Sequence, residues 1–194
     1  MPAVSVADIT VLPRIKETPH ARARTVKSIT TAPQGFEGEG FPVRRAFAGV
    51  DLAELDPFIH LDQMGEVEYA PGEPKGTPWH PHRGFETVTY MIQGAMKHED
   101  SAGNKGDLNP GDVQWMTAGR GVIHSEMPEK TDGLVRGFQL WLNLPKKLKM
   151  IDPSYNDIPS KDIPEVNIEN GRIRVISGTY KDVKGPGAPY TGVV

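Results

Sequence analysis

The 194-residue chain contains 22 Lys and Arg residues against 25 Asp and Glu residues, which gives a net charge of −3. This balance provides no electrostatic footprint for nucleic acid or for an anionic membrane surface, so direct nucleic-acid binding is not expected. The chain has no cysteine, which excludes disulfides, zinc fingers and thiolate catalysis, and any transition metal must be held by imidazole and carboxylate groups.

The N-terminal sequence MPAVSVADITVLPRIK lacks the charged and long apolar regions of a secretory signal. No apolar run approaches the roughly 18 residues that are needed to span a bilayer. We therefore expect a cytoplasmic protein without a membrane interaction. The hydrophobic fraction of 37% is sufficient for the core of one sizeable domain.

Short strands joined by turns are predicted along most of the chain, because β-branched and aromatic runs alternate with Gly and Pro. No segment shows helical periodicity over more than two turns. We expect a Gly-rich loop at 35–43, a helical turn at 50–55 and a hairpin loop at 101–107. The expected strands are 7–12, 25–31, 44–50, 58–64, 85–94, 95–101, 112–119, 121–127, 137–144 and 172–180. Their spacing predicts an all-β barrel or a double-sheet jelly roll.

The first group of candidate metal ligands is His80-Pro81-His82. On an extended backbone, residues i and i+2 point to the same face, so both imidazoles can converge on one point. Pro81 stiffens this arrangement because it fixes its own φ and biases His80 toward extended backbone. Glu86 continues the same alternation through Gly84, and it is a candidate carboxylate for the same site.

The second group is His124-Ser-Glu126, again with the i and i+2 spacing of a strand. About three short strands and two turns separate it from the first group, which is the connectivity that returns the chain beside His80 and His82. Two adjacent strands inside a barrel would then present three imidazoles and a carboxylate to one interior point. The combination predicts metal binding far more strongly than either group alone.

The stretch HPHRGFETVTYMIQGAMKHEDSAGNKGDLNPGDVQWMTAGRGVIHSEMPE, residues 80–129, resembles the signature of the pirin family, a branch of the cupin superfamily. The likeness continues through GFQLWLNLPKKLKMIDPSYN at 137–156 and covers about residues 35–180. It implies a cupin-type double-stranded β-helix, in which the ligands of the family correspond to His80, His82, His124 and Glu126. It also implies that Glu86 lies near the site without being a ligand.

Pirins usually contain two cupin barrels. By this resemblance, residues 1–145 form the N-terminal cupin barrel with its preceding strands. Residues 146–194 form a connector and the start of a second cupin that is largely missing, because the sequence from 145 on is rich in Pro and Lys and ends soon after the strand at 172–180.

The resemblance implies one divalent transition metal, usually iron, and the ligand chemistry also suits Mn, Ni, Cu or Zn. Some pirins are quercetin 2,3-dioxygenases, so one hypothesis is an oxidoreductase that cleaves a flavonol with dioxygen, with Glu126 as the catalytic acceptor of the flavonol proton. The other hypothesis follows from eukaryotic pirins, which resemble redox-sensing transcription cofactors. In that case the protein has no turnover and its iron state alters binding to a protein partner.

The remaining histidines and tryptophans receive structural interpretations. We expect His98 to be solvated near a hairpin tip, and His60 to hydrogen-bond at the barrel wall. His20 lies in a loop-like region without partners. The tryptophans, Trp79, Trp115 and Trp141, are expected to pack in the core rather than to stack on a substrate.

Overall fold

The computed structural model describes residues 25–70, 73, 75–129 and 133–188. The chain divides into two compact units, residues 1–31 and 32–194. Residues 25–31 of the first unit have no regular secondary structure, so the strand predicted there is wrong. The strand predicted at 7–12, and His20, lie outside the described residues.

The second unit consists almost entirely of short strands, as the spacing of turns in the sequence predicted. The strands are β1 Gln34–Glu37, β2 Phe41–Arg45, β3 Phe58–Tyr69, β4 Thr77–His82, β5 Phe85–Gln93, β6 Met96–Asp100, β7 Lys105–Leu108, β8 Val113–Thr117, β9 Val122–Pro128, β10 Gly133–Asn143, β11 Ser154–Ile158, β12 Glu165–Ile168, β13 Gly171–Arg174, β14 Thr179–Tyr180 and β15 Val183–Lys184. Short 3₁₀ helices are η1 Leu52–Glu54, η2 Lys146–Leu148 and η3 Ser160–Asp162.

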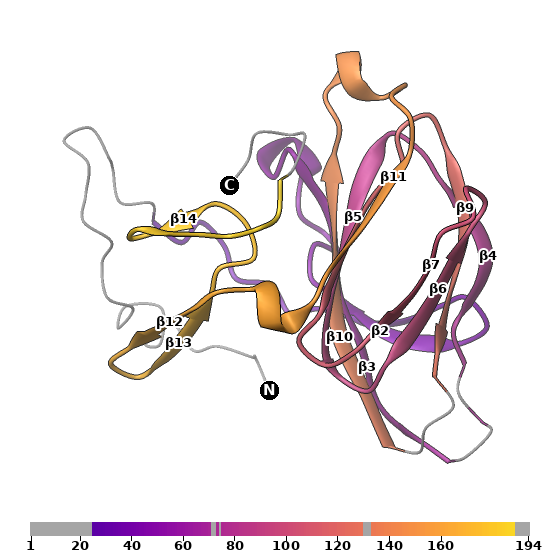
Figure 1. Cartoon of the computed structure of the whole chain (residues 1–194), viewed down its shortest axis with the longest axis horizontal. Coiled ribbons are helices and arrows are strands. Elements are labelled where there is room, and N and C mark those ends of the chain that lie inside the picture. The colour runs from indigo at the N-terminus through magenta and orange to yellow at the C-terminus, as the bar shows by residue number, and fades with distance from the viewer. Residues whose placement is uncertain (1–24, 71–72, 74, 130–132, 189–194) are drawn as a thin grey trace. The chain divides into compact units, whose positions relative to one another are not determined.

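Two antiparallel sheets form the barrel (Figure 1). The larger sheet has seven strands in the order β1-β2-β3-β10-β5-β8-β11, and the smaller sheet has four in the order β4-β9-β6-β7. Side chains of β9 in the smaller sheet hydrogen-bond to side chains of β5 and β10 in the larger one, so the two sheets face each other across a common interior. The predicted all-β, double-sheet architecture is confirmed.

Apolar residues from both sheets pack between them and close one part of this interior. The main buried cluster draws on β2, β3, β5, β6, β7 and β10, and it consists of Phe41, Val43, Met64, Met91, Met96, Leu108 and Val135. Burial of this apolar surface is the dominant favourable contribution to folding. Four members of this cluster, Phe41, Val43, Met64 and Met96, also line the cavity that contains the polar residues of β4 and β9.

The burial pattern along β6 shows how alternation positions polar groups in the interior. Met96, His98 and Asp100 are buried, whereas the intervening Lys97 and Glu99 are exposed. This is the period-two alternation of a strand with one face toward the core. The prediction that His98 is solvated is therefore wrong, because the register of β6 turns its imidazole inward.

The first hairpin of the barrel differs from the sequence prediction. The segment expected as a loop at 35–43 contains most of β1 and most of β2, with Gly38 and Gly40 at the turn at positive φ angles of 51° and 106°. Glycine adopts such angles without steric cost. The strand expected at 44–50 ends already at Arg45, and the helical turn expected at 50–55 is present as η1.

The segment after residue 145 contributes directly to the larger sheet. Strand β11 pairs with β8 over its full length, from Ser154 with Thr117 to Ile158 with Val113. Further along, Arg174 donates to the Tyr90 hydroxyl at 3.0 Å and to the Gly111 carbonyl at 2.8 Å. The domain boundary at 145 stays a prediction. Within the described residues, no helix has the length and apolar character needed to cross a membrane.

Candidate metal centre

His80 and His82 bring their imidazoles together on β4, as their i and i+2 spacing predicted. The two Nε2 atoms lie 3.0 Å apart. His80 Nδ1 lies 2.7 Å from the Pro78 carbonyl, which can only accept, so this nitrogen carries the proton and the Nε2 lone pair is left for a ligand. The strand therefore holds two imidazole donors at one point.

His124 completes the group from β9, where it pairs directly with His80 in the antiparallel register. Its ring centroid lies 4.3 Å from that of His80 and 4.7 Å from that of His82. One nitrogen from each of the three rings lies within 4.8 Å of the others. His124 is fully buried, and its Nε2 has no hydrogen-bond partner among the described residues. A buried polar atom without a partner is costly, and a bound cation would satisfy it.

Burial also keeps His82 and His124 uncharged. It lowers the pKa of His82 to about 3, and the neighbouring imidazoles of His124 and His80 contribute in the same direction. Burial likewise lowers the pKa of His124 to about 3, and the neighbouring imidazoles of His80 and His98 lower it further. Both side chains are therefore neutral at physiological pH. Neutral imidazole is the form that binds transition metals.

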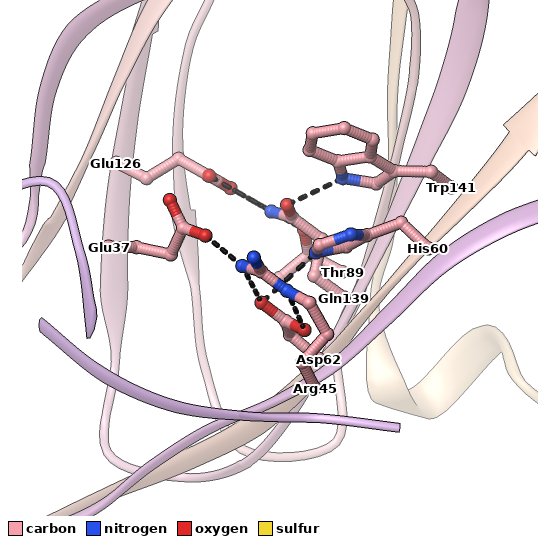
Figure 2. Close-up of polar contacts among 8 residues, drawn as sticks. All are labelled: Glu37, Arg45, His60, Asp62, Thr89, Glu126, Gln139 and Trp141. Carbon is pink, nitrogen blue, oxygen red and sulfur yellow. Dashed lines mark hydrogen bonds and ion pairs between the residues drawn. The ribbon is translucent and has the colours of Figure 1, made fainter. Parts of the chain in front are cut away.

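Glu126 lies two residues beyond His124 on β9 and is held by Gln139 of β10 (Figure 2). The Gln139 amide donates to both carboxylate oxygens, at 3.1 and 2.9 Å, and the Thr89 hydroxyl lies 3.4 Å from one of them. The group of ligand atoms within 4.8 Å contains the three histidines and not Glu126. Coordination by Glu126 thus stays a prediction, although this carboxylate lines the same cavity as His80 and His82.

Glu86, the other candidate carboxylate, is fully buried on β5. Its Oε1 accepts hydrogen bonds from the Trp115 indole at 3.1 Å and from the Thr117 hydroxyl at 2.9 Å. Both donors come from β8, the neighbouring strand of the larger sheet. These contacts connect the Glu86 side chain to β8. Glu86 is not among the residues that line the cavity shared by His80, His82 and Glu126.

A cavity of about 160 Å³ opens onto His80 and His82 of the cluster. Trp141 forms part of its wall, stacked between His60 at 4.4 Å and Phe85 at 4.5 Å. Trp141 thus packs against aromatic neighbours, as expected, and its ring also lines the cavity. Trp79, by contrast, is 56% exposed, so its expected place in the core is wrong.

A charged cluster that the sequence analysis did not identify lines another part of the cavity. Asp62 accepts from Arg45 at 3.2 and 2.9 Å and lies 3.0 Å from His60 Nε2, and Arg45 also contacts Glu37 (Figure 2). Burial opposes ionisation of Asp62, but hydrogen bonds from His60 and Arg45 outweigh it and hold the pKa of this carboxyl below its ordinary value.

The cluster around Asp62 contains three groups with ligand-like spacing, namely Glu37, His60 and Asp62. The Arg45 guanidinium already pairs with both carboxylates, which makes a second cation there unfavourable. The i and i+2 spacing of His60 and Asp62 on a predicted strand was the one signal in the sequence that could have revealed this pair.

The two facing sheets and the buried histidine cluster define a cupin-type β-barrel with a candidate site for a divalent metal. The chain belongs to the Pirin family, whose family model matches residues 40–142. The proposed resemblance to pirins is thereby confirmed.

Similar proteins include enzymes and pirins from distant organisms. The chain is 46% identical over 162 residues to a Pseudomonas aeruginosa protein named "Putative quercetin 2,3-dioxygenase", a match that covers 83% of this chain and 56% of the relative. It is 46% identical over 149 residues to human Pirin, covering 76% of this chain and 49% of the relative. The crystal structure of quercetin 2,3-dioxygenase from Acinetobacter baumannii matches with a TM-score of 0.78 and 42% identity, over 84% of this chain and 59% of that one. The chain thus spans about half the length of the curated relatives it matches.

Proposed function

We propose that His80, His82, His124 and Glu126 hold one divalent transition metal, with Fe(II) as the native ion, and that the protein is a flavonol dioxygenase. The observation that carries this proposal is the convergence of three imidazoles, with the buried Nε2 of His124 left without a partner among the described residues. Three nitrogen donors and one carboxylate suit a first-row transition metal and disfavour Mg²⁺.

When bound, the ion would supply Lewis acidity and a route for electrons between substrate and dioxygen. Glu126 would accept the proton of the flavonol hydroxyl, since its carboxylate lines the cavity. The Gln139 amide donates to both oxygens of this carboxylate and holds it in place for that transfer. Geometry of this kind, with a base in reach and fixed by a second residue, is what general-base catalysis requires.

The cavity and the relatives support a small aromatic substrate. Its volume of about 160 Å³ is smaller than the roughly 300–1,000 Å³ of pockets that enclose a drug-sized ligand, so a flavonol would be only partly enclosed. The cavity wall combines the aromatic ring of Trp141 with polar groups such as Glu126 and Asp62, which suits a flat, hydroxylated ligand. The names of the Pseudomonas and Acinetobacter relatives point to quercetin as the first substrate to test.

The experiment is elemental analysis of the purified protein together with an aerobic quercetin-depletion assay on the same sample. We expect about one metal ion per chain and depletion that depends on it. His82→Ala should abolish both, whereas Ile123→Ala, whose side chain is 49% exposed on β9 beside His124, should change neither. Metal without depletion would refute the enzyme and favour the regulatory hypothesis. Absence of metal after reconstitution with Fe(II) would refute the site.

A further inference from the structure

His98 and Asp100 of β6 form a buried pair directly behind His124. The side chains of His98 and Asp100 are each 1% exposed. Strand β6 pairs with β9, and the register places Asp100 opposite His124. The pair is therefore buried on β6, directly beside β9, the strand that carries the third imidazole of the cluster.

A continuous line of hydrogen-bonding atoms runs from this pair to His124. His124 Nδ1 lies 3.3 Å from His98 Nδ1. On the other side of the His98 ring, Nε2 lies 3.4 Å from Asp100 Oδ2. The remaining nitrogen of His124 is the Nε2 that has no partner among the described residues.

Asp100, at the far end of this line, can only accept hydrogen bonds. Asp100 Oδ1 accepts from the backbone N–H groups of Ala102 and Asn104, each at 2.9 Å, and Oδ2 accepts from Asn104 Nδ2 at 2.8 Å. Burial opposes ionisation of Asp100, yet these hydrogen bonds and that of His98 outweigh it and lower the pKa of the carboxyl. An ionised carboxylate has no proton to donate, so in the contact between His98 and Asp100 the imidazole must be the donor.

The protons can then be assigned along the line. Asp100 accepts, so His98 carries its proton on Nε2. The two facing Nδ1 atoms share one proton, and because His98 donates from Nε2, that proton is assigned to Nδ1 of His124. We propose that His98 and Asp100 are positioning residues that hold His124 in the Nδ1-protonated tautomer and thereby leave its Nε2 lone pair free for the metal. This inference rests on the proposed metal centre.

The His98 ring is also fixed in orientation, as such a role requires. It stacks on Tyr155 of β11 with centroids 4.6 Å apart and an interplanar angle of 29°. The Tyr155 hydroxyl donates to Asp157 at 2.8 Å and accepts from Gln114 at 3.1 Å. Gly106 on β7 leaves the space for this hydroxyl, because a Cβ there would collide with it. Partners that orient a metal-binding histidine typically contribute about 10- to 100-fold to metal affinity.

The first test is the zinc affinity of the metal-free full chain, measured by competition with a chelating dye. His98→Phe keeps a ring against Tyr155 and removes both ring nitrogens, so we expect zinc affinity to fall about 10- to 100-fold. Tyr155→Phe is the matched control, because it removes a hydroxyl beside the same ring without changing the hydrogen bonds from Asp100 to His124. It should leave zinc affinity within about twofold of the wild type, since it changes no group on that line.

Asp100→Asn gives the sharper result. The side-chain oxygen of the introduced asparagine can keep the two backbone hydrogen bonds of the turn, while its amide group faces His98 as a donor. His98 would then carry its proton on Nδ1 and donate to His124, which moves the His124 proton to Nε2. Long-range ¹H–¹⁵N spectra of the metal-free protein distinguish the two tautomers. We expect His124 to be protonated at Nδ1 in the wild type and at Nε2 in this variant, with weaker zinc binding.

The outcomes separate this inference from the proposed function. If the wild type binds zinc while His98→Phe and Asp100→Asn bind it equally well, the metal centre stands and the role of His98 is refuted. If the wild type binds no zinc, both proposals fail. A wild-type His124 protonated at Nε2 would overturn the inference by itself, even if neither variant folds.

Discussion

Trp141 donates its indole N–H to the side-chain oxygen of Gln139 at 2.9 Å. An indole N–H can only donate, so this contact fixes which end of the Gln139 amide faces the tryptophan. The amide nitrogen is then directed at Glu126, where it meets both carboxylate oxygens. The orientation of the proposed fourth ligand therefore depends on a residue of the cavity wall that the sequence analysis assigned to packing.

Trp141→Phe tests this dependence. Phenylalanine keeps an aromatic ring beside His60 and Phe85 and removes the indole N–H that donates to Gln139. Loss of one hydrogen bond of this kind should lower the free energy of unfolding by about 1 kcal/mol, measured by urea denaturation. We also expect zinc affinity to fall about 10-fold, because Gln139 can then rotate and release Glu126. Unchanged affinity in a folded variant would show that Glu126 is oriented by other contacts.

A matched pair of substitutions tests which carboxylate serves the metal. Glu86→Gln keeps an acceptor for the Trp115 and Thr117 donors, so we expect metal content to equal that of the wild type. Glu126→Gln removes the proposed ligand charge and should lower metal affinity about 10-fold or more. Elemental analysis after dialysis against a weak chelator measures both. Loss of metal in Glu86→Gln alone would reverse the assignment.

Most of the barrel strands and the convergence of His80, His82 and His124 could be predicted because both follow from local rules. The i and i+2 spacing of His80 with His82 needs only an extended backbone to bring the rings together, and the register of β4 with β9 then adds His124. The tight turn at 38–40 was less predictable. A Gly-rich sequence is typical both of a long loop and of a short turn between two paired strands, so it does not distinguish the two.

The parts that could not be predicted depend on pairing between distant strands. His98 was assigned to solvent because the sequence does not show which face of β6 meets the core. The contact of Arg45 with Asp62 joins β2 to β3, and neither residue stands in a recognisable motif. Gln139 reaches Glu126 only because the two sheets face each other. Each of these is a tertiary relationship without a local signal.

Arg45→Met tests the charged cluster in the cavity. Asp62 is 3% exposed, and its described ion pairs are with Arg45 and His60. Removal of the guanidinium leaves it with His60 alone among these partners. Because Arg45 itself is partly exposed, we expect the free energy of unfolding to fall by about 1 to 3 kcal/mol. Arg44→Met is the control, since the contact of Arg44 with Glu66 joins two exposed side chains at 3.9 Å. Equal effects in the two variants would argue against a special role for Arg45.

The depressed pKa values of His82 and His124 predict how the stability of the metal-free protein depends on pH. Both groups have a pKa of about 3 when folded and near 6.5 when unfolded, so between these values the unfolded chain binds more protons. Stability is then fully present above pH 6.5 and is lost as pH falls toward 3. We expect the free energy of unfolding to drop by about 3 kcal/mol between about pH 6.5 and 5, measured by urea denaturation.

The control for this pH dependence is His82→Leu, which removes one of the two titrating groups and should flatten the dependence between about pH 6.5 and 5. Asp62 and Asp100 do not contribute in that window, because their pKa values lie below the ordinary carboxyl range and their effect comes at lower pH. Bound zinc should oppose the loss, since protons compete with the metal for the same nitrogens. A free energy of unfolding that stays constant across this window in the metal-free wild type would contradict the buried, neutral state of the cluster.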